Sequence, residues 1–228
     1  MAMKHEQAAL IMLIEALYRR GEDWERREQP RRPEKLKNAA FAVLAQLTRQ
    51  DVEGYRAAKA EGSFGEDRII LLQPPSQDRE AIATLWCRWN FESAVANCGF
   101  YYGVWSMVSP LPGTKVEGDG KRVPAFIGYR FETPEIGTNH NYYHSQPCRS
   151  MGSKVQEIVN ALQVSSKMPT WPLAAANEVE LLLCMILSLY GFIGFRQIRD
   201  AVLNDRRAQR NPALTDALAK VGRLEILH

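Results

Sequence analysis

Apolar residues recur at helical spacing near the start of the chain, in the stretch "EQAALIMLIEALYRR". Residues three and four positions apart share one face of a helix. Here that face comprises Leu10, Leu13, Ile14 and Leu17. Pro30 and Pro33 interrupt the pattern and predict a bend. Beyond the bend we expect a second helix through "KLKNAAFAVLAQL" and a third that begins at Thr48, so the first third is predicted to be helical.

The middle third contains short apolar and aromatic runs that are separated by turn-forming residues. The runs that predict strands are "DRIILLQPP", "WCRWNF", "CGFYYGVWSMV", "PAFIGYRFET" and "NYYHSQ". The stretch "SQDREAIATLWCRW" predicts a helix that begins at Ser76. The stretch "SPLPGTKVEGDGKR" is polar and rich in glycine, and it predicts a long hairpin loop.

The last third returns to helical patterns. The stretch "GSKVQEIVNALQV" predicts a helix, and "SSKMPTWP" after it predicts a loop. Asn177 or a neighbour then begins an apolar helix that we expect to end near Tyr190 and Gly191, with an amphipathic helix after it.

The final helix has recognisable boundaries in the sequence. Asn211 is a favourable N-cap, Pro212 suits the first helical position, and Gly222 predicts the end. Helices, then strands, then helices predict an α+β fold with N-terminal helices, a central, mostly antiparallel sheet and a C-terminal helical bundle. We expect three regions, 1–65, 66–150 and 151–228, within one compact domain.

Composition and charge narrow the class of protein. A chain with 46% hydrophobic and 24% charged residues is typical of a globular protein and not of a disordered one. The net charge of +3 is modest, but basic residues gather in two places. In "RRGEDWERREQPRRPEKLK" both signs are mixed, which predicts a solvated helix face. The second group is a candidate nucleic-acid-binding surface and consists of Arg196, Arg199, Arg206, Arg207 and Arg210.

The cysteines and the longest apolar stretch indicate the compartment. The cysteines are scattered without any C-x-x-C pair, at Cys87, Cys98, Cys148 and Cys184, which favours a reducing cytoplasm. The apolar stretch 181–195 would cover about 22 Å as a helix, less than a bilayer core requires. We therefore expect a soluble, cytoplasmic protein with a buried apolar helix and no membrane contact.

The stretch "NHNYYHSQPC", residues 139–148, is the main candidate for a site. His140, His144 and Cys148 are spaced four apart, and two imidazoles with a thiolate could bind a divalent metal such as zinc. On an extended strand, however, His140 and Cys148 would lie about 26 Å apart, so a metal site needs a bend. Tyr142 and Tyr143 favour a strand, and Pro147 should interrupt it. We favour a strand with ordinary histidine contacts; a metal site, or a metal-free site in which His144 acts as acid or base, remains the alternative.

An enzyme of this sequence would be a metal-dependent phosphodiesterase or nuclease, and a divalent metal would be its cofactor. His144 would be acid, base or ligand, and His140 a second ligand or phosphate contact. The partner carboxylate would come from Glu132, Glu135 or Asp119. The chain contains neither G-x-x-x-x-G-K-[ST] nor G-x-G-x-x-G, which argues against a nucleotide-driven motor and a dinucleotide oxidoreductase.

Two further motifs are weaker. The triplet in "EGDGK" resembles a nuclease motif, but the glycines on both sides of Asp119 favour a hairpin tip. Arg223 and His228 have the spacing of one class of helical ribonucleases, but Gly222 and the chain end disfavour the stable helix that this motif requires.

One part of the chain resembles other proteins. The order "GYRFETP", "NHNYYHSQ" and "MPTWPLAAANEVELLLCMILSLYG" covers about residues 128–191. It is similar to certain uncharacterised bacterial proteins, some of them associated with restriction or phage-defence loci. The chain departs from that pattern at Gln146 and Pro147, where a more apolar continuation is expected. The resemblance implies a bacterial origin and a shared unit of sheet and helix.

Taken together, these patterns favour an accessory or scaffold subunit of a bacterial multiprotein assembly that acts on nucleic acid in phage defence. Its apolar helices would bind a protein partner, either another chain or a second copy, and its C-terminal arginines would lie near nucleic acid. The alternatives are the metal-dependent hydrolase that uses His140 and His144, and a nucleic-acid-binding module that uses the C-terminal arginines alone.

Overall fold

The computed structural model describes residues 2–32, 68–75, 81–90, 97–106, 125–134, 137, 141–148 and 170–223. The predicted helices after residue 33 and at 152–164 lie outside these residues, as does the predicted loop at 109–122. The same holds for His140, Glu135, Asp119 and His228. The chain divides into two compact units. The first consists of Met1–Arg19, Phe131–Ser145 and Trp171–His228, and the second of Arg20–Arg130 and Gln146–Thr170.

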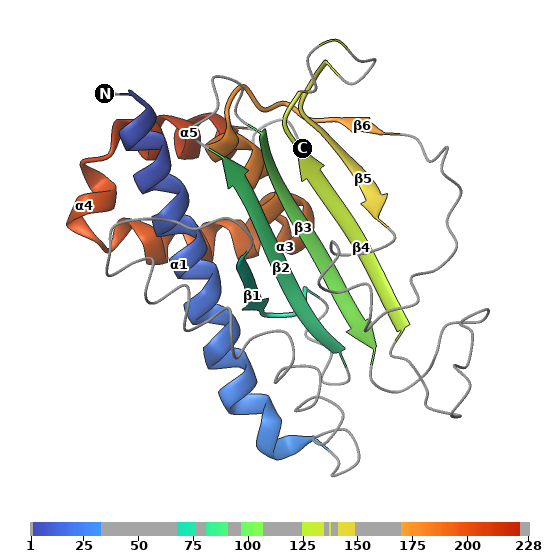
Figure 1. The fold of residues 1–228 in the computed structure, drawn as a ribbon. Helices are drawn as coiled ribbons and strands as arrows, with labels where there is room; N and C mark the ends of the chain where they lie inside the picture. Colours follow the sequence, from blue (N-terminus) through green and yellow to red (C-terminus); the bar gives the residue numbers. More distant parts are fainter. Residues whose placement is uncertain are drawn as a thin grey trace. The chain divides into compact units, whose positions relative to one another are not determined.

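The element order confirms the predicted α+β fold. Helices lie in the N-terminal and C-terminal regions, and an antiparallel sheet lies between them in the sequence (Figure 1). The helices are α1 (Ala2–Glu28), α3 (Glu178–Leu203), α4 (Arg206–Gln209) and α5 (Pro212–Gly222), with a 3-10 turn, η1, at Gln29–Arg31. The strands are β1 (Arg68–Leu72), β2 (Ala81–Asn90), β3 (Asn97–Ser106), β4 (Ala125–Glu132), β5 (His144–Cys148) and β6 (Trp171–Pro172), and their order in the sheet follows the chain.

Helix α1 forms where the apolar periodicity predicts it. The four residues of the predicted stripe, at positions 10, 13, 14 and 17, are at most 1% exposed. The helix ends at Glu28, and Pro30 lies in the 3-10 turn that follows, as the predicted bend requires. The run of mixed charges that begins at Arg19 was predicted to be a solvated helix face. This prediction holds only in part, because Glu25, Glu28 and Arg32 of the run are buried.

Unit 2 contains the best-defined part of the sheet. Ten residue pairs join β2 to β3 and five join β1 to β2, both antiparallel. One cross-strand row is formed by Ile70, Leu85 and Tyr102, all buried. Rows of this kind provide the side-chain contacts that stabilise a sheet.

The helix predicted in "SQDREAIATLWCRW" is wrong for residues 81–89, which belong to β2, whereas the overlapping strand predicted in "WCRWNF" is confirmed for residues 86–90. Local propensity favours a helix there, because alanine and leucine are good helix formers. The ladders to β1 and β3 bury Ala83, Thr84, Leu85 and Cys87, and tertiary pairing of this kind overrides a weak local preference.

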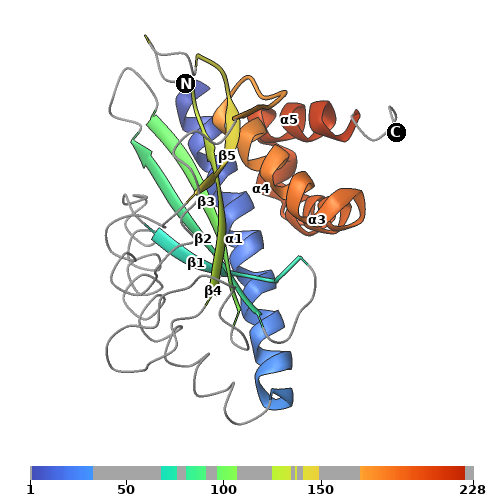
Figure 2. The ribbon, with the colours of Figure 1, turned by 90° about the vertical axis from the view of Figure 1, so that its right-hand side faces the viewer.

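Unit 1 contains the C-terminal helices. Helix α3 packs against α4 and α5, and Figure 2 shows the three lying together. The predicted boundary at Gly191 is confirmed, because Gly191 adopts φ +62° and ψ −174° and interrupts α3. Residues 178–190 before the break include the apolar run that is buried at positions 181–186, and the amphipathic helix follows.

The caps of α3 and α5 agree with the sequence. Asn177 accepts a hydrogen bond from the backbone N–H of Glu180, and Asn211 accepts one from that of Leu214. Helix α5 ends at Gly222, but with ordinary helical angles at Arg223 and no left-handed glycine cap. The expected loop at "SSKMPTWP" contains the two-residue strand β6, and Pro147 does not end β5, which continues to Cys148.

Candidate functional site

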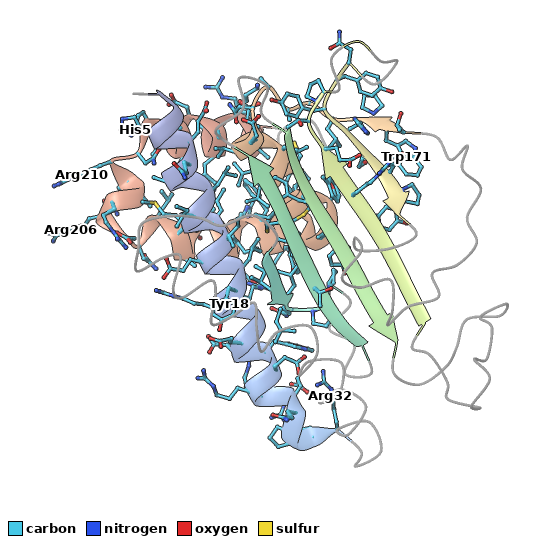
Figure 3. The ribbon with its side chains drawn as sticks, viewed as in Figure 1. His5, Tyr18, Arg32, Trp171, Arg206 and Arg210 are labelled. Atoms are coloured by element: carbon cyan, nitrogen blue, oxygen red, sulfur yellow. The ribbon has the colours of Figure 1, made fainter. Side chains whose placement is uncertain are left out.

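The five predicted arginines lie on the last part of α3 and around α4. Arg196 and Arg199 belong to α3, Arg206 and Arg207 to α4, and Arg210 follows α4 directly. Arg199 is partly exposed and the other four are exposed. Arg206 and Arg210 point away from the helices in Figure 3. Their guanidinium groups are therefore accessible to a partner.

Two of these arginines are paired with a neighbouring aspartate. Arg199 Nη2 lies 2.8 Å from Asp200 Oδ1, and Arg207 Nη2 lies 2.6 Å from Asp205 Oδ2. The hydrogen bonds from Arg207 lower the pKa of Asp205. By contrast, Arg206 and Arg210 make no ion pair within the described part of the chain.

The first half of α1 extends this surface. The hydrogen bond between Asp205 and Arg207 is the main cause of the lowered pKa of Asp205 and of the raised pKa of Arg207; the charge of Arg19 adds a smaller effect in the same direction on Asp205, and that of Glu15 on Arg207. Arg19 is 71% exposed and pairs with Glu15. We call the four arginines of this region the α1–α4 basic surface; they are Arg19, Arg206, Arg207 and Arg210.

Positive charge is concentrated in the C-terminal helices as a whole. Residues 192–223 contain seven arginines and lysines but three aspartates, a net charge of +4. The entire chain has a net charge of +3. The remainder of the chain is therefore close to neutral, and the net charge of the whole chain does not reveal this uneven distribution.

The structure brings His144 and Glu132 together, two of the three residues proposed for catalysis. His144 Nδ1 lies 2.9 Å from the carbonyl oxygen of Tyr142, and a carbonyl can only accept, so Nδ1 donates. Nε2 then faces Oε2 of Glu132 at 3.5 Å. The ring of Tyr142 meets that of His144 edge-on, with the ring centroids 5.7 Å apart.

This geometry has two interpretations. A histidine with a carbonyl at one nitrogen could act as acid or base through the other nitrogen, but here that nitrogen faces Glu132 and not open space. The arrangement satisfies both ring nitrogens only when each carries a proton, because a carbonyl and an ionised carboxylate can only accept. The His144 side chain is 1% exposed and that of Glu132 14%, which leaves little room for a substrate at the imidazole.

The metal site predicted at His140, His144 and Cys148 stays a prediction, because His140 lies outside the described residues. Among the described residues, no group of three or more His, Cys, Asp or Glu side chains could bind an ion. His144 and Cys148 are the two ends of the extended strand β5, about 13 Å apart, too far for both to bind one ion.

Helix α3 combines a core segment with an exposed apolar end. It is the one helix, within the described ranges, whose length and composition would allow it to cross a membrane. The break at Gly191 leaves a first segment of about 20 Å, which is shorter than a bilayer core, and most of that segment is buried. Ile193, just beyond the break, is 75% exposed.

Two features had no clear signal in the sequence. The effect of Arg19 on α4 involves residues almost two hundred positions apart, and the exposure of Ile193 depends on the direction that α3 takes after Gly191.

Comparison of the chain with protein-family models, with curated proteins and with solved structures gave no match. The functional argument therefore depends on the residues themselves.

Proposed function

We propose that this protein is a non-catalytic accessory subunit that binds nucleic acid through the α1–α4 basic surface and so attaches a larger assembly to it. The observation that carries this proposal is the +4 charge of residues 192–223, with Arg206 and Arg210 exposed on it. Arginines at such a surface bind the phosphates of a nucleic acid and release the counterions that surround them. The result is affinity for nucleic acid without preference for a sequence.

Three features of the surface agree with backbone binding. Arg206 and Arg210 are exposed and, within the described part of the chain, unpaired, so a phosphate would not have to displace a carboxylate from them. Arg19 and Arg207 have carboxylate partners, but both are more than 70% exposed, and such pairs are weak in water. Among the residues that the structure describes, no exposed aromatic side chain on which a base could stack belongs to α4 or to residues 204–211, so we expect little preference for single strands.

The test compares two double variants of equal charge. Arg206→Gln/Arg210→Gln removes two cations from the proposed surface. Arg26→Gln/Arg27→Gln removes two exposed cations from the other end of α1. The affinity for a labelled duplex is measured by fluorescence anisotropy at salt concentrations from about 50 to about 200 mM. The plot of log affinity against log salt should be less steep in the first variant than in the wild type, by about 1.8 in slope.

The control variant should keep the wild-type slope. Equal losses in both variants would show that net charge alone attracts the duplex, and would contradict a defined surface. The proposed assembly would belong to bacterial systems that act on nucleic acid, phage defence among them, and it would include a protein partner. That extension rests on the resemblance of residues 128–191.

The contact between His144 and Glu132 supports a second candidate, a hydrolase in which His144 is the base and Glu132 its partner. On this candidate, His144→Gln would abolish hydrolysis of a generic phosphodiester such as bis(p-nitrophenyl) phosphate, with or without Mn²⁺. On the first proposal the wild type has no such activity, and His144→Gln leaves duplex affinity unchanged. A rate that is proportional to wild-type concentration and is lost in the variant would favour the hydrolase.

A further inference from the structure

An open groove on the surface, called the cavity below, has a volume of about 480 Å³ and lies between the end of α3 and α5; Asp200, Ala219 and Arg223 of its lining are exposed. Small-molecule sites in proteins usually measure about 300–1,000 Å³, so its size suits a small organic ligand. It contains none of the four arginines of the α1–α4 basic surface, so it does not depend on the proposed function.

The floor of this cavity is apolar. Leu203 of α3 and Leu218 and Ala219 of α5 line it. Residues three and four positions apart share one face of a helix. One such face of α5 lines the cavity and consists of Thr215, Leu218, Ala219 and Gly222. Between Thr215 and Gly222 this face runs about 10 Å along the helix, enough for a chain of several methylene groups.

The polar groups around the floor leave one unbalanced charge. Arg199 donates to Asp200 at 2.9 Å, so these two opposite charges compensate each other. The hydroxyl of Thr215 is 3.1 Å from the carbonyl oxygen of Asn211 and donates within its own helix. The backbone N–H of Arg223 bonds to carbonyl oxygens of α5, but its guanidinium group makes no hydrogen bond or ion pair within the described part of the chain, and it supplies a net positive charge.

The position of Arg223 makes that charge decisive for the ligand. Gly222 and Arg223 lie at the C-terminal end of α5, where unpaired carbonyl groups favour cations. An anion could bind there only if its attraction to the charge of Arg223 is stronger than its repulsion by these carbonyl groups. A guanidinium group can bind a carboxylate through two parallel hydrogen bonds.

From these contacts we propose that the cavity binds an amphipathic organic carboxylate of medium chain length. Its hydrocarbon part lies on Leu203, Leu218 and Ala219, and its carboxylate pairs with Arg223. Arg199 and Asp200 remain paired with each other at the edge.

Calorimetric titration of the full chain with decanoate, decanol and decyltrimethylammonium tests the proposal. We expect decanoate to bind saturably and at least tenfold more tightly than the cationic amphiphile. Arg223→Gln should remove that preference, because the carbonyl groups at the end of α5 then meet the ligand without a cation. Arg27→Gln, a loss of equal charge at an exposed residue outside both the cavity and the α1–α4 basic surface, should leave decanoate affinity unchanged.

A second pair of variants tests the place of binding. Ala219→Phe adds a large ring at a residue that lines the cavity, and it should abolish decanoate binding. Ala201 is exposed, as Ala219 is, but does not line the cavity, so Ala201→Phe should have no effect. Equal affinity for the three amphiphiles, absence of saturable binding, or unchanged binding in a folded Ala219→Phe variant would each overturn the proposal. Duplex binding by Ala219→Phe should equal that of the wild type, so each proposal can fail alone.

Discussion

Asn211 Nδ2 donates a hydrogen bond of 2.8 Å to the backbone carbonyl oxygen of His5, 206 positions earlier in the chain. The same side chain accepts from the backbone N–H of Leu214 at 3.1 Å and so caps α5. Asn211 is 5% exposed, so water cannot easily replace either bond. One amide therefore both starts α5 and joins it to α1.

Two substitutions separate these roles. Asn211→Asp keeps an acceptor for the cap but loses the donor, and we expect it to lower the free energy of unfolding by about 1–2 kcal/mol. Asn211→Ala loses both bonds and should cost about 2–3 kcal/mol. Urea unfolding monitored by circular dichroism measures both. An Asn211→Asp protein as stable as the wild type would show that the bond to His5 contributes nothing.

Gly21 of α1 lies against the backbone of β1. A Cβ atom at Gly21 would overlap the backbone carbonyl oxygen of Leu71. Gly→Ala in a helix normally adds about 1 kcal/mol of stability, but here we expect a loss of about 2 kcal/mol because backbone must move. Gly222→Ala is the matched control, since nothing lies within 4 Å of its Cβ position, and it should be neutral or stabilising. A stabilised Gly21→Ala protein in thermal unfolding would contradict this packing.

The ion pair between Arg32 and Glu25 is buried in unit 2. Two hydrogen bonds of 2.6 and 2.9 Å join the groups, and the Arg32 side chain is fully buried. Arg32→Met leaves the carboxylate without its partner and should cost about 3 kcal/mol. Adding Glu25→Gln should recover part of that loss. The exposed pair of Arg26 and Asp23 is the control, and Arg26→Met should change the free energy of unfolding by less than about 0.5 kcal/mol. Equal costs for Arg32→Met and Arg26→Met in urea unfolding would contradict the burial of the first pair.

Two glutamates at the start of α3 should respond to neutralisation in opposite ways. Burial raises the pKa of Glu178 above its ordinary value of 4.5; a hydrogen bond to its own backbone opposes this rise, and the charge of Glu6 adds to it. Between 4.5 and the raised pKa the folded state binds more protons than the unfolded chain, so this group lowers stability as pH rises through that window. Glu178→Gln should therefore gain stability relative to the wild type as pH increases from 4 to 7.

Glu180 provides the contrast. Its carboxylate accepts hydrogen bonds from Lys220 Nζ at 2.6 Å and from the backbone N–H of Ala176 at 2.8 Å. Glu180→Gln should lower the thermal midpoint at pH 7, because Lys220 then loses its partner. The prediction fails if the two variants shift the midpoint in the same direction at pH 7.

Local signals in the sequence were sufficient for much of the fold. Asn211 and Pro212 begin α5 because a cap and a first-turn proline act within a few residues, and Gly191 marks the break in α3 for the same reason. Residues 81–85 of β2 were predicted only as helix, because the pairing with β3 that decides their structure lies beyond any local window, whereas the aromatic residues from 86 onward also indicated a strand.

The candidate sites were predictable in residue type but not in arrangement. His144 and Glu132 could be named as acid–base candidates, yet their contact depends on the tertiary fold. The C-terminal arginines were recognisable as a basic group, whereas the pairing of Arg207 with Asp205 and the proximity of Arg19 were not. Glu25 and Arg32 were interpreted as solvated because a run of alternating charges does not reveal which residues face a core.

The most direct test of the proposed function is the salt dependence of duplex binding by the wild-type protein. If the four arginines of the α1–α4 basic surface contact phosphates, log affinity should fall with log salt with a slope of about −3 to −4. A duplex and a single strand of equal length should bind within about tenfold of each other. A slope near zero, or no binding at about 50 mM salt, would contradict the account.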